Sequence, residues 1–152
     1  MKLNFYSDPG HGWLRVPVQL LDSWGLIDSI TPFSHVRNNW AYLEEDRDAA
    51  AFLDKARELG QAVKLREINC AHNYSPIRNY ASYSGARLRA QLAALWVPGL
   101  TVELYGTAYT LADTVRRRGW RVRRVSDGLE MLLPFARLAE CMPLACQNKT
   151  AL

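Results

Sequence analysis

The residues SDPGHGWLRVP, numbers 7–17, place an aspartate and a histidine within one glycine-rich turn. A histidine that is held by a carboxylate can act as a general base or bind a metal ion. Asp8 and His11 provide such a pair, and Glu45, within the acidic run 44–46, provides a further carboxylate. The glycines beside His11 would let a substrate approach the backbone. Asp8, His11 and Glu45 are therefore the candidate catalytic residues.

The same turn also has a structural interpretation, and we favour it over catalysis. Asp-Pro-Gly is a turn-forming sequence, in which His11 needs only to form a local hydrogen bond. The acidic run precedes a predicted helix, and negative charge is favourable at a helix N-terminus. The sequence therefore does not assign a catalytic residue outright.

Metal and cofactor motifs give little signal in this chain. Cys70 and His72 are too closely spaced for a usual zinc pair, and no second pair such as Cys-x-x-Cys exists. Cys141 and Cys146 are separated by a proline in a predicted tail. A P-loop, a dinucleotide-binding fingerprint and a Gly-x-Ser-x-Gly motif are all missing from the sequence. We expect no metal and no cofactor, and the odd number of cysteines favours a reducing cytosol.

A run of arginines dominates the second half of the sequence. Up to Tyr83 there are nine Lys/Arg against ten Asp/Glu, and from Ser84 onward there are ten against five. Such a basic stripe can bind nucleic acid or an acidic protein surface, although it can also be a solvated face that keeps the protein soluble. The predicted binding residues are Arg116, Arg117, Arg118, Arg121, Arg123 and Arg87.

The first half of the chain shows alternating strands and two short helices. Pro17 suits the first position of a helix that Gly25 ends, and Asp48 is the expected N-cap of a helix that Gly60 ends. Arg37–Asn39 is typical of a hairpin turn. The expected strands are 3–6, 13–16, 33–36, 40–45 and 62–68, and the expected helices are 17–25 and 49–59.

The second half is predicted to begin at a boundary near Ser84–Gly85. A helix over 86–96 precedes a strand over 100–105, and Thr107 or Thr110 caps a further helix that Gly119 ends. Asp127–Gly128 predicts a two-residue turn between strands 120–126 and 129–134. The chain is expected to finish with a helix over 135–142 and a loose tail.

These elements predict an α+β fold with antiparallel hairpins and helices packed on one face. Residues 13–59 and 101–142 share the order strand, helix, hairpin, helix, which raises the question of a duplication. The expected organisation is a domain over 1–83 and a basic helix-strand-helix-hairpin region over 84–152 packed against it. No apolar run approaches the roughly 20 residues that a membrane span needs.

Four segments of the first half, DPGHGWLRVP, LIDSITPFS, AYLEEDRDAAAF and IRNYASY, carry a resemblance to a known family. They resemble short, uncharacterised proteins carried by bacteriophages and plasmids, in which DPGHGWL-x-VP is followed by a glycine-ended helix and a segment like YLEEDCDA-x-x-F. The resemblance covers about residues 5–83 and implies an origin on a mobile element. Arg47 stands where the family usually has cysteine, so a thiol role at that position is excluded for this chain.

Binding is the function that these observations favour. The chain is interpreted as a small phage- or plasmid-encoded accessory protein in the bacterial cytoplasm, attached to a host protein or ribonucleoprotein complex. The mobile-element resemblance points to inhibition of a defence system such as CRISPR or restriction. One alternative is a regulator that binds DNA or RNA through the basic patch Arg116–Arg124, and another is a small enzyme that uses His11. No membrane partner is expected.

Overall fold

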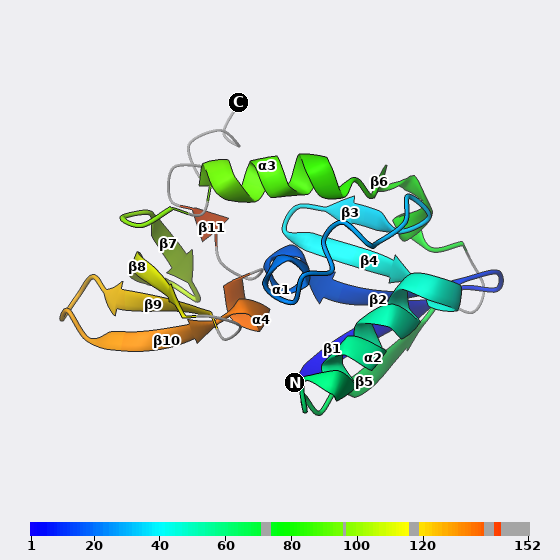
Figure 1. The fold of residues 1–152 in the computed structure, drawn as a ribbon, viewed down its shortest axis with the longest axis horizontal. Helices are drawn as coiled ribbons and strands as arrows, with labels where there is room; N and C mark the ends of the chain where they lie inside the picture. The colour runs from blue at the N-terminus through cyan, green and yellow to red at the C-terminus, as the bar shows by residue number, and fades with distance from the viewer. Residues whose placement is uncertain (71–73, 96, 116–118, 139–141, 144–152) are drawn as a thin grey trace.

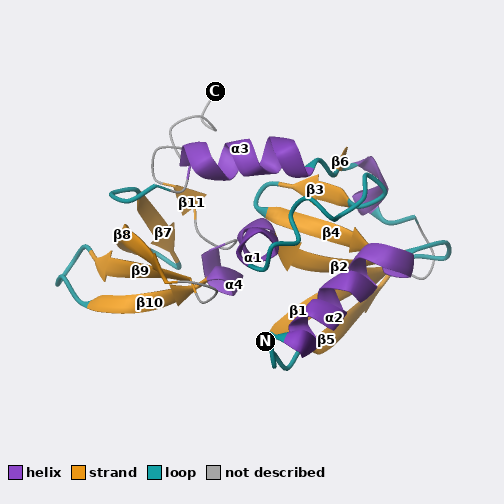
Figure 2. Ribbon diagram, viewed as in Figure 1, coloured by secondary structure: helices purple, strands orange, loops and turns teal. Residues whose placement is uncertain are grey.

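The structure, a computed structural model, describes residues 1–70, 74–95, 97–115, 119–138 and 142–143 and contains two β-sheets (Figures 1 and 2). The first is six-stranded in the order β5-β1-β2-β4-β3-β6, and the second is five-stranded in the order β10-β9-β8-β7-β11. With helices packed on these sheets, the fold is α+β, as the sequence predicts.

The first sheet is formed by residues of the first half alone. Its pairs are antiparallel except for β1 and β5, which run parallel with Leu3 opposite Leu65. Its strands are β1 (Lys2–Ser7), β2 (Gly12–Pro17), β3 (His35–Arg37), β4 (Trp40–Glu44), β5 (Lys64–Asn69) and β6 (Ala81–Ser82).

Strand alternation gives the first sheet two different faces. Leu14 and Val16 of β2 point into the main core, which also contains Phe52 of α2 (Ala50–Glu58). The core also receives side chains from α1 (Val18–Ser23) and α3 (Gly85–Leu95). On the opposite face, Trp13 and Tyr42 pack with Ile77 of a short 3-10 helix, Pro76–Asn79. The second face is therefore aromatic and only partly covered.

The second sheet shares one buried core with the first. Val102, Leu111 and Val122 belong to the same cluster as the core residues of the first sheet. The helix α4 (Phe135–Leu138) contacts both α1 and β2, and so joins the two halves (Figure 1). The strands are β7 (Thr101–Leu104), β8 (Thr107–Val115), β9 (Gly119–Arg124), β10 (Glu130–Pro134) and β11 (Met142–Pro143).

The helix that was predicted to end at Gly119, over residues 111–118, is wrong. Residues 111–115 lie in strand β8, and residues 116–118 lie outside the described residues. The reason is a two-residue turn at Tyr105–Gly106, where φ is 50° and 75°. Positive φ at both central positions is the hairpin geometry, but tyrosine is an unusual residue for it, so the sequence signal was weak. Thr107, Tyr109 and Thr110 then favour a strand. Gly119 correspondingly begins β9 instead of ending a helix.

This correction removes the expected repeat. The second half contains the sequential hairpins β7–β8 and β9–β10, whereas the first half places α1 after β2. The order strand, helix, hairpin, helix is thus found only once in the described residues. In the described residues, the basic region is a helix followed by an antiparallel sheet.

Other predicted elements are confirmed. Strands 3–6, 13–16 and 62–68 correspond to β1, β2 and β5, and the helix over 86–96 corresponds to α3. The 37–39 turn joins β3 to β4 with Asn38 at φ 54°. Within the described residues, no helix is both long enough and apolar enough to cross a membrane.

The β9–β10 hairpin is confirmed, but its loop differs from the expected two-residue turn. The amide of Arg124 donates to the carbonyl of Leu129, so residues 125–128 form a four-residue loop. Gly128 closes that loop at φ 72°, which is a left-handed conformation. The amide of Gly128 also donates to the carbonyl of Arg124, at the other end of the loop.

The conformation of Gly128 gives a test of this hairpin. Gly128→Val should destabilise the protein by about 1–2 kcal/mol, because a β-branched residue resists positive φ. Gly128→Asn, which tolerates that region better, is the matched control and should cost much less. Among the described residues, no atom outside the adjacent ones lies within 4 Å of a Cβ at this position, so a steric clash with them would not explain the difference. Thermal unfolding measures both variants, and equal melting temperatures would contradict the assigned loop.

Candidate functional site

Asp8 is the buried anchor of the first turn. Its side chain is 0% exposed and accepts two hydrogen bonds from Arg78, Nε to Oδ2 and Nη2 to Oδ1, both 2.7 Å long. Backbone amides of Gly10, His11 and Ser75 donate to the same carboxylate at 2.9–3.0 Å. The carboxylate therefore fixes the turn and also ties it to the segment that carries Arg78.

These bonds account for the acidity of Asp8. The Arg78 guanidinium holds the pKa of Asp8 well below its ordinary value, against the opposing effect of burial, and the backbone amides add to the lowering. A carboxylate so fully bonded stays ionised and has no free lone pair directed at a substrate. The catalytic role considered for Asp8 therefore does not fit its geometry, because the group is structural.

His11 and Glu45 are brought together, but the carboxylate beside the imidazole is that of Glu44. His11 Nδ1 lies 3.9 Å from Glu44 Oε1. The β2–β4 register places Trp13 opposite Glu44, so His11, which directly precedes β2, lies near the end of β4. Ligand atoms of His11, Glu44 and Glu45 all lie within 4.8 Å of one another. Chemically, the group can accept a proton or hold a cation.

Asp48 is a second buried anchor, in place of the predicted helix cap. It is 1% exposed and lies inside a π-helical turn, Glu45–Ala49, that precedes α2. Its Oδ2 accepts hydrogen bonds from Thr31 N, Thr31 Oγ1 and Ser34 Oγ at 3.0, 2.7 and 2.5 Å. The capping role falls instead to Glu44, whose side chain accepts from Asp46 N. The Asp48 prediction failed because a buried loop competes for its oxygens.

Ser34 extends this anchor to the site. Its hydroxyl accepts a hydrogen bond of 3.0 Å from the amide of Glu44 while donating to Asp48. The loop Thr31–Ser34 is thus fastened at both ends, to Asp48 and to the end of β4. Between these fastened ends, Phe33 is 78% exposed.

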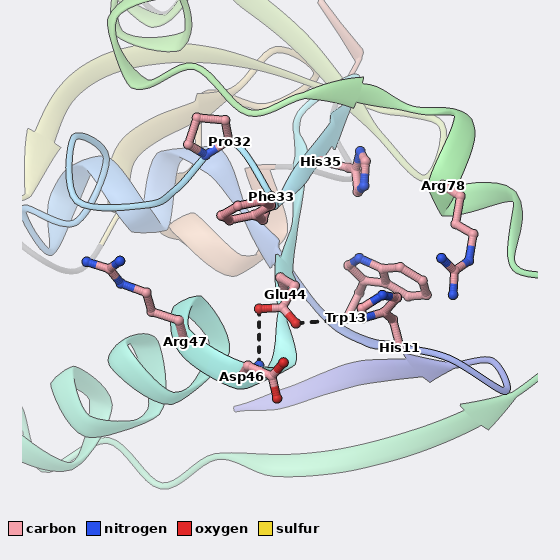
Figure 3. A pocket seen from close by; sticks show the side chains of 9 residues that line it. All are labelled: His11, Trp13, Pro32, Phe33, His35, Glu44, Asp46, Arg47 and Arg78. Atoms are coloured by element: carbon pink, nitrogen blue, oxygen red, sulfur yellow. Dashed lines mark hydrogen bonds and ion pairs between the residues drawn. The ribbon is translucent and has the colours of Figure 1, made fainter.

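An open cavity of about 590 Å³ lies where the two anchored segments meet. This volume is within the range of small ligand sites. Arg78 and Arg47 contribute to its edge, and Pro32 lies beside Phe33. Figure 3 shows the side chains around this space, which include two aromatics, two histidines and two carboxylates: Trp13, Phe33, His11, His35, Glu44 and Asp46.

Trp13 connects the cavity to the aromatic face of the sheet. The indole is 2% exposed, and its N–H has no hydrogen-bond partner among the described residues. Arg78 lies over the rings of Trp13 and Tyr74, at 5.3 and 5.0 Å from their centroids. Buried donors are normally paired, so this buried and unpaired indole N–H is an exception beside the cavity.

The described arginines of the predicted basic patch are largely paired with acids. Arg121 lies 3.4 Å from Asp113, Arg123 lies 2.9 Å from Glu130, and Arg87 is exposed on α3. Arg124 lies 2.5 Å from Asp127 and lowers the pKa of that carboxyl to about 2. Arg121 and Arg123 share the exposed side of β9. Arg116, Arg117 and Arg118 lie outside the described residues.

The sequence analysis missed several residues of the cavity. Trp13, Phe33, His35 and Arg78 were not singled out, although Trp13 and Tyr42 share a face by simple alternation. No local signal could have found the Asp8–Arg78 pair, whose members are 70 residues apart. Phe33 could not be identified as a candidate contact residue from the sequence, because its exposure and the hydrogen bonds of its loop are tertiary features.

Comparison with known proteins adds no assignment to this geometry. No family model, no curated protein and no solved structure matches the chain.

The Asp8 anchor predicts a specific dependence on pH. Asp8→Asn should lower the free energy of unfolding by about 3 kcal/mol at pH 7, because it leaves Arg78 without its buried partner. Since the folded pKa lies below the unfolded one, the contribution of Asp8 is complete above about pH 4 and is lost as the pH falls further. The difference in free energy of unfolding between wild type and Asp8→Asn should therefore become smaller as the pH falls below about 4.

Urea unfolding at pH 7 and pH 3 measures this difference. Asp127→Asn is the matched control, because Asp127 also pairs with an arginine but lies exposed in a loop. It should change stability only slightly. Equal losses for the two variants at pH 7 would contradict the anchoring role of Asp8.

Proposed function

We propose that the chain is a binding protein whose contact site is the cavity beside Phe33. In this proposal it is a small phage- or plasmid-encoded accessory protein that attaches to a host protein in the bacterial cytoplasm. The observation that carries the proposal is the exposed Phe33 in a loop whose two ends are hydrogen-bonded to buried Asp48.

The fastened loop makes Phe33 a suitable anchor for a partner. Single exposed apolar residues are common and need no explanation on their own. Here, however, the ring borders an open cavity and its loop is already ordered, so little conformational entropy is lost on binding. Burying a phenylalanine contributes about 1.5–3 kcal/mol, and such anchors dominate protein interfaces. An apolar or aromatic side chain of the partner would fit between Phe33 and Trp13.

The ion pairs of the arginines favour a host protein over nucleic acid as the partner. Arg121, Arg123 and Arg124 each face a carboxylate, which reduces the net charge that a phosphate backbone would meet. The mobile-element resemblance supports a defence system, such as CRISPR or restriction, as the source of the partner. Inhibition would then follow from occupying a surface that the host protein needs.

Affinity purification from the bacterial host tests the proposal. Phe33→Ser should capture at least tenfold less of the partner protein than wild type, because the exposed aromatic side chain is removed while the core is unchanged. Val125→Ser is the matched control, since Val125 is also an exposed apolar residue on a loop. Protein and nucleic acid that remain bound are both quantified.

A double variant, Arg121→Glu with Arg123→Glu, separates this proposal from the nucleic-acid alternative. We expect it to retain the protein partner and to fold normally, because both side chains are exposed. Loss of bound DNA or RNA in this double variant, with capture unaffected by Phe33→Ser, would overturn the proposal in favour of a nucleic-acid regulator.

A further inference from the structure

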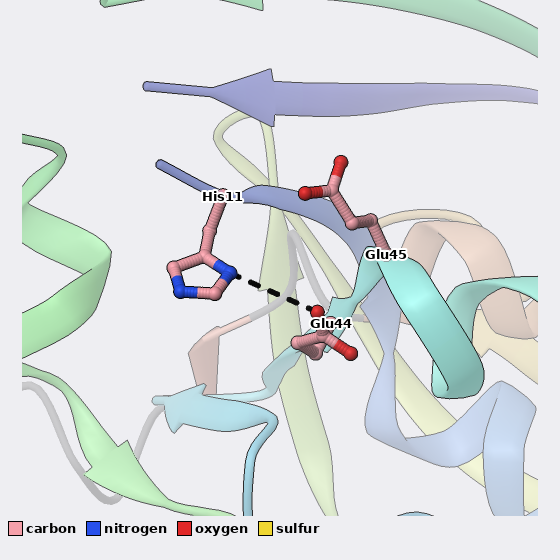
Figure 4. A group of neighbouring side chains, drawn as sticks. All are labelled: His11, Glu44 and Glu45. Carbon is pink, nitrogen blue, oxygen red and sulfur yellow. Dashed lines mark ion pairs between the residues drawn. The ribbon is translucent and has the colours of Figure 1, made fainter. Parts of the chain in front are cut away.

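Among the described residues, one group of three has ligand atoms near enough to one another that they could hold a metal ion: His11, Glu44 and Glu45. One imidazole nitrogen and two carboxylate oxygens lie within 4.8 Å of one another (Figure 4). Ligands of a bound ion, at about 2.0–2.2 Å from it, stand about 3–3.5 Å apart. The ligand atoms that lie farthest apart must therefore approach each other by up to about 1.3–1.8 Å. That movement is available, because the His11 side chain is 47% exposed and Glu45 is exposed.

The backbone is held in place at two of the three residues, His11 and Glu44. The amide of His11 donates to Asp8, and the amide of Glu44 donates to Ser34. Glu44 Oε2 accepts from Asp46 N, which leaves Oε1 as the oxygen nearest to His11. His11 and Glu44 can therefore close on an ion by side-chain rotation, and the exposed side chain of Glu45 can follow.

Gly12 shows that the Glu45 carboxylate is accommodated against β2. A Cβ at position 12 would lie 2.5 Å from Glu45 Oε2 and 2.5 Å from the Phe5 ring. Any larger residue would push the carboxylate out of the group. The glycine therefore has a steric role beside the cluster.

The charges of the cluster favour a cation. Among the described residues, no lysine or arginine forms an ion pair with Glu44 or Glu45, and Arg78 of the same cavity is bound to Asp8. Two neighbouring carboxylates without a basic partner repel each other, and a divalent ion relieves this repulsion. Mixed imidazole and carboxylate ligands suit ions such as Zn²⁺ or Mn²⁺.

We propose that His11, Glu44 and Glu45 bind one divalent transition-metal ion at the edge of the cavity. Three protein ligands leave at least one coordination position for water or for an oxygen or nitrogen atom of a ligand. That position faces the cavity, because His11 and Glu44 both line it. The proposal departs from the expectation of no metal, which stays untested, and it does not depend on the protein partner proposed above.

Isothermal titration of the full chain with Zn²⁺ tests the site. We expect one ion per chain, with affinity reduced at least tenfold by His11→Ala and by Glu45→Gln. Asp54→Asn, an exposed carboxylate on α2, and Cys70→Ser, which removes a described free thiol, are the matched controls and should leave the affinity unchanged. Thermal unfolding of each variant without metal confirms that it is folded.

A second measurement locates the ion independently. Mn²⁺ should broaden the amide resonances of residues 11–13 and 44–46 in wild type, and this broadening should vanish in Glu45→Gln. Absence of Zn²⁺ binding by wild type would overturn the proposal. So would binding that survives His11→Ala and Glu45→Gln but is lost in Cys70→Ser.

Discussion

The ion pair between buried Asp8 and partly exposed Arg78 is the interaction on which the site depends. It joins the turn before β2 to the segment 75–78, although the two are far apart in the chain. Burial of a carboxylate is costly unless its oxygens are bonded, and here five donors satisfy them. The pair fixes the backbone of His11 on one side and places Arg78 over Trp13 on the other.

A second buried carboxylate, Asp48, gives the cavity its opposite wall. Through Thr31 and Ser34 it orders the loop that presents Phe33, and through Ser34 it reaches the end of β4. Each carboxylate thus connects segments that do not adjoin in sequence. The cavity between them is consequently pre-formed, which lowers the entropic cost of binding a partner or an ion.

Much of the fold could be predicted because its signals are local. Alternation identified β2 and β4, and glycines ended helices such as α1. The failure at β8 arose from Tyr105, which adopts positive φ without belonging to the residues that usually do. The site could be predicted only in part: His11 and the acidic run were found, whereas Arg78 and Phe33 depend on tertiary contacts that no spacing reveals.

Photo-crosslinking in the bacterial host tests the central claim, that this cavity is where the protein meets its partner. Replacing Phe33 by p-benzoylphenylalanine keeps an aromatic ring at the cavity, and the same replacement at Leu132, exposed on β10, samples the second sheet. The account predicts a crosslink to one host protein from position 33 and none from position 132. Crosslinks from position 132 alone, or to nucleic acid, would contradict it.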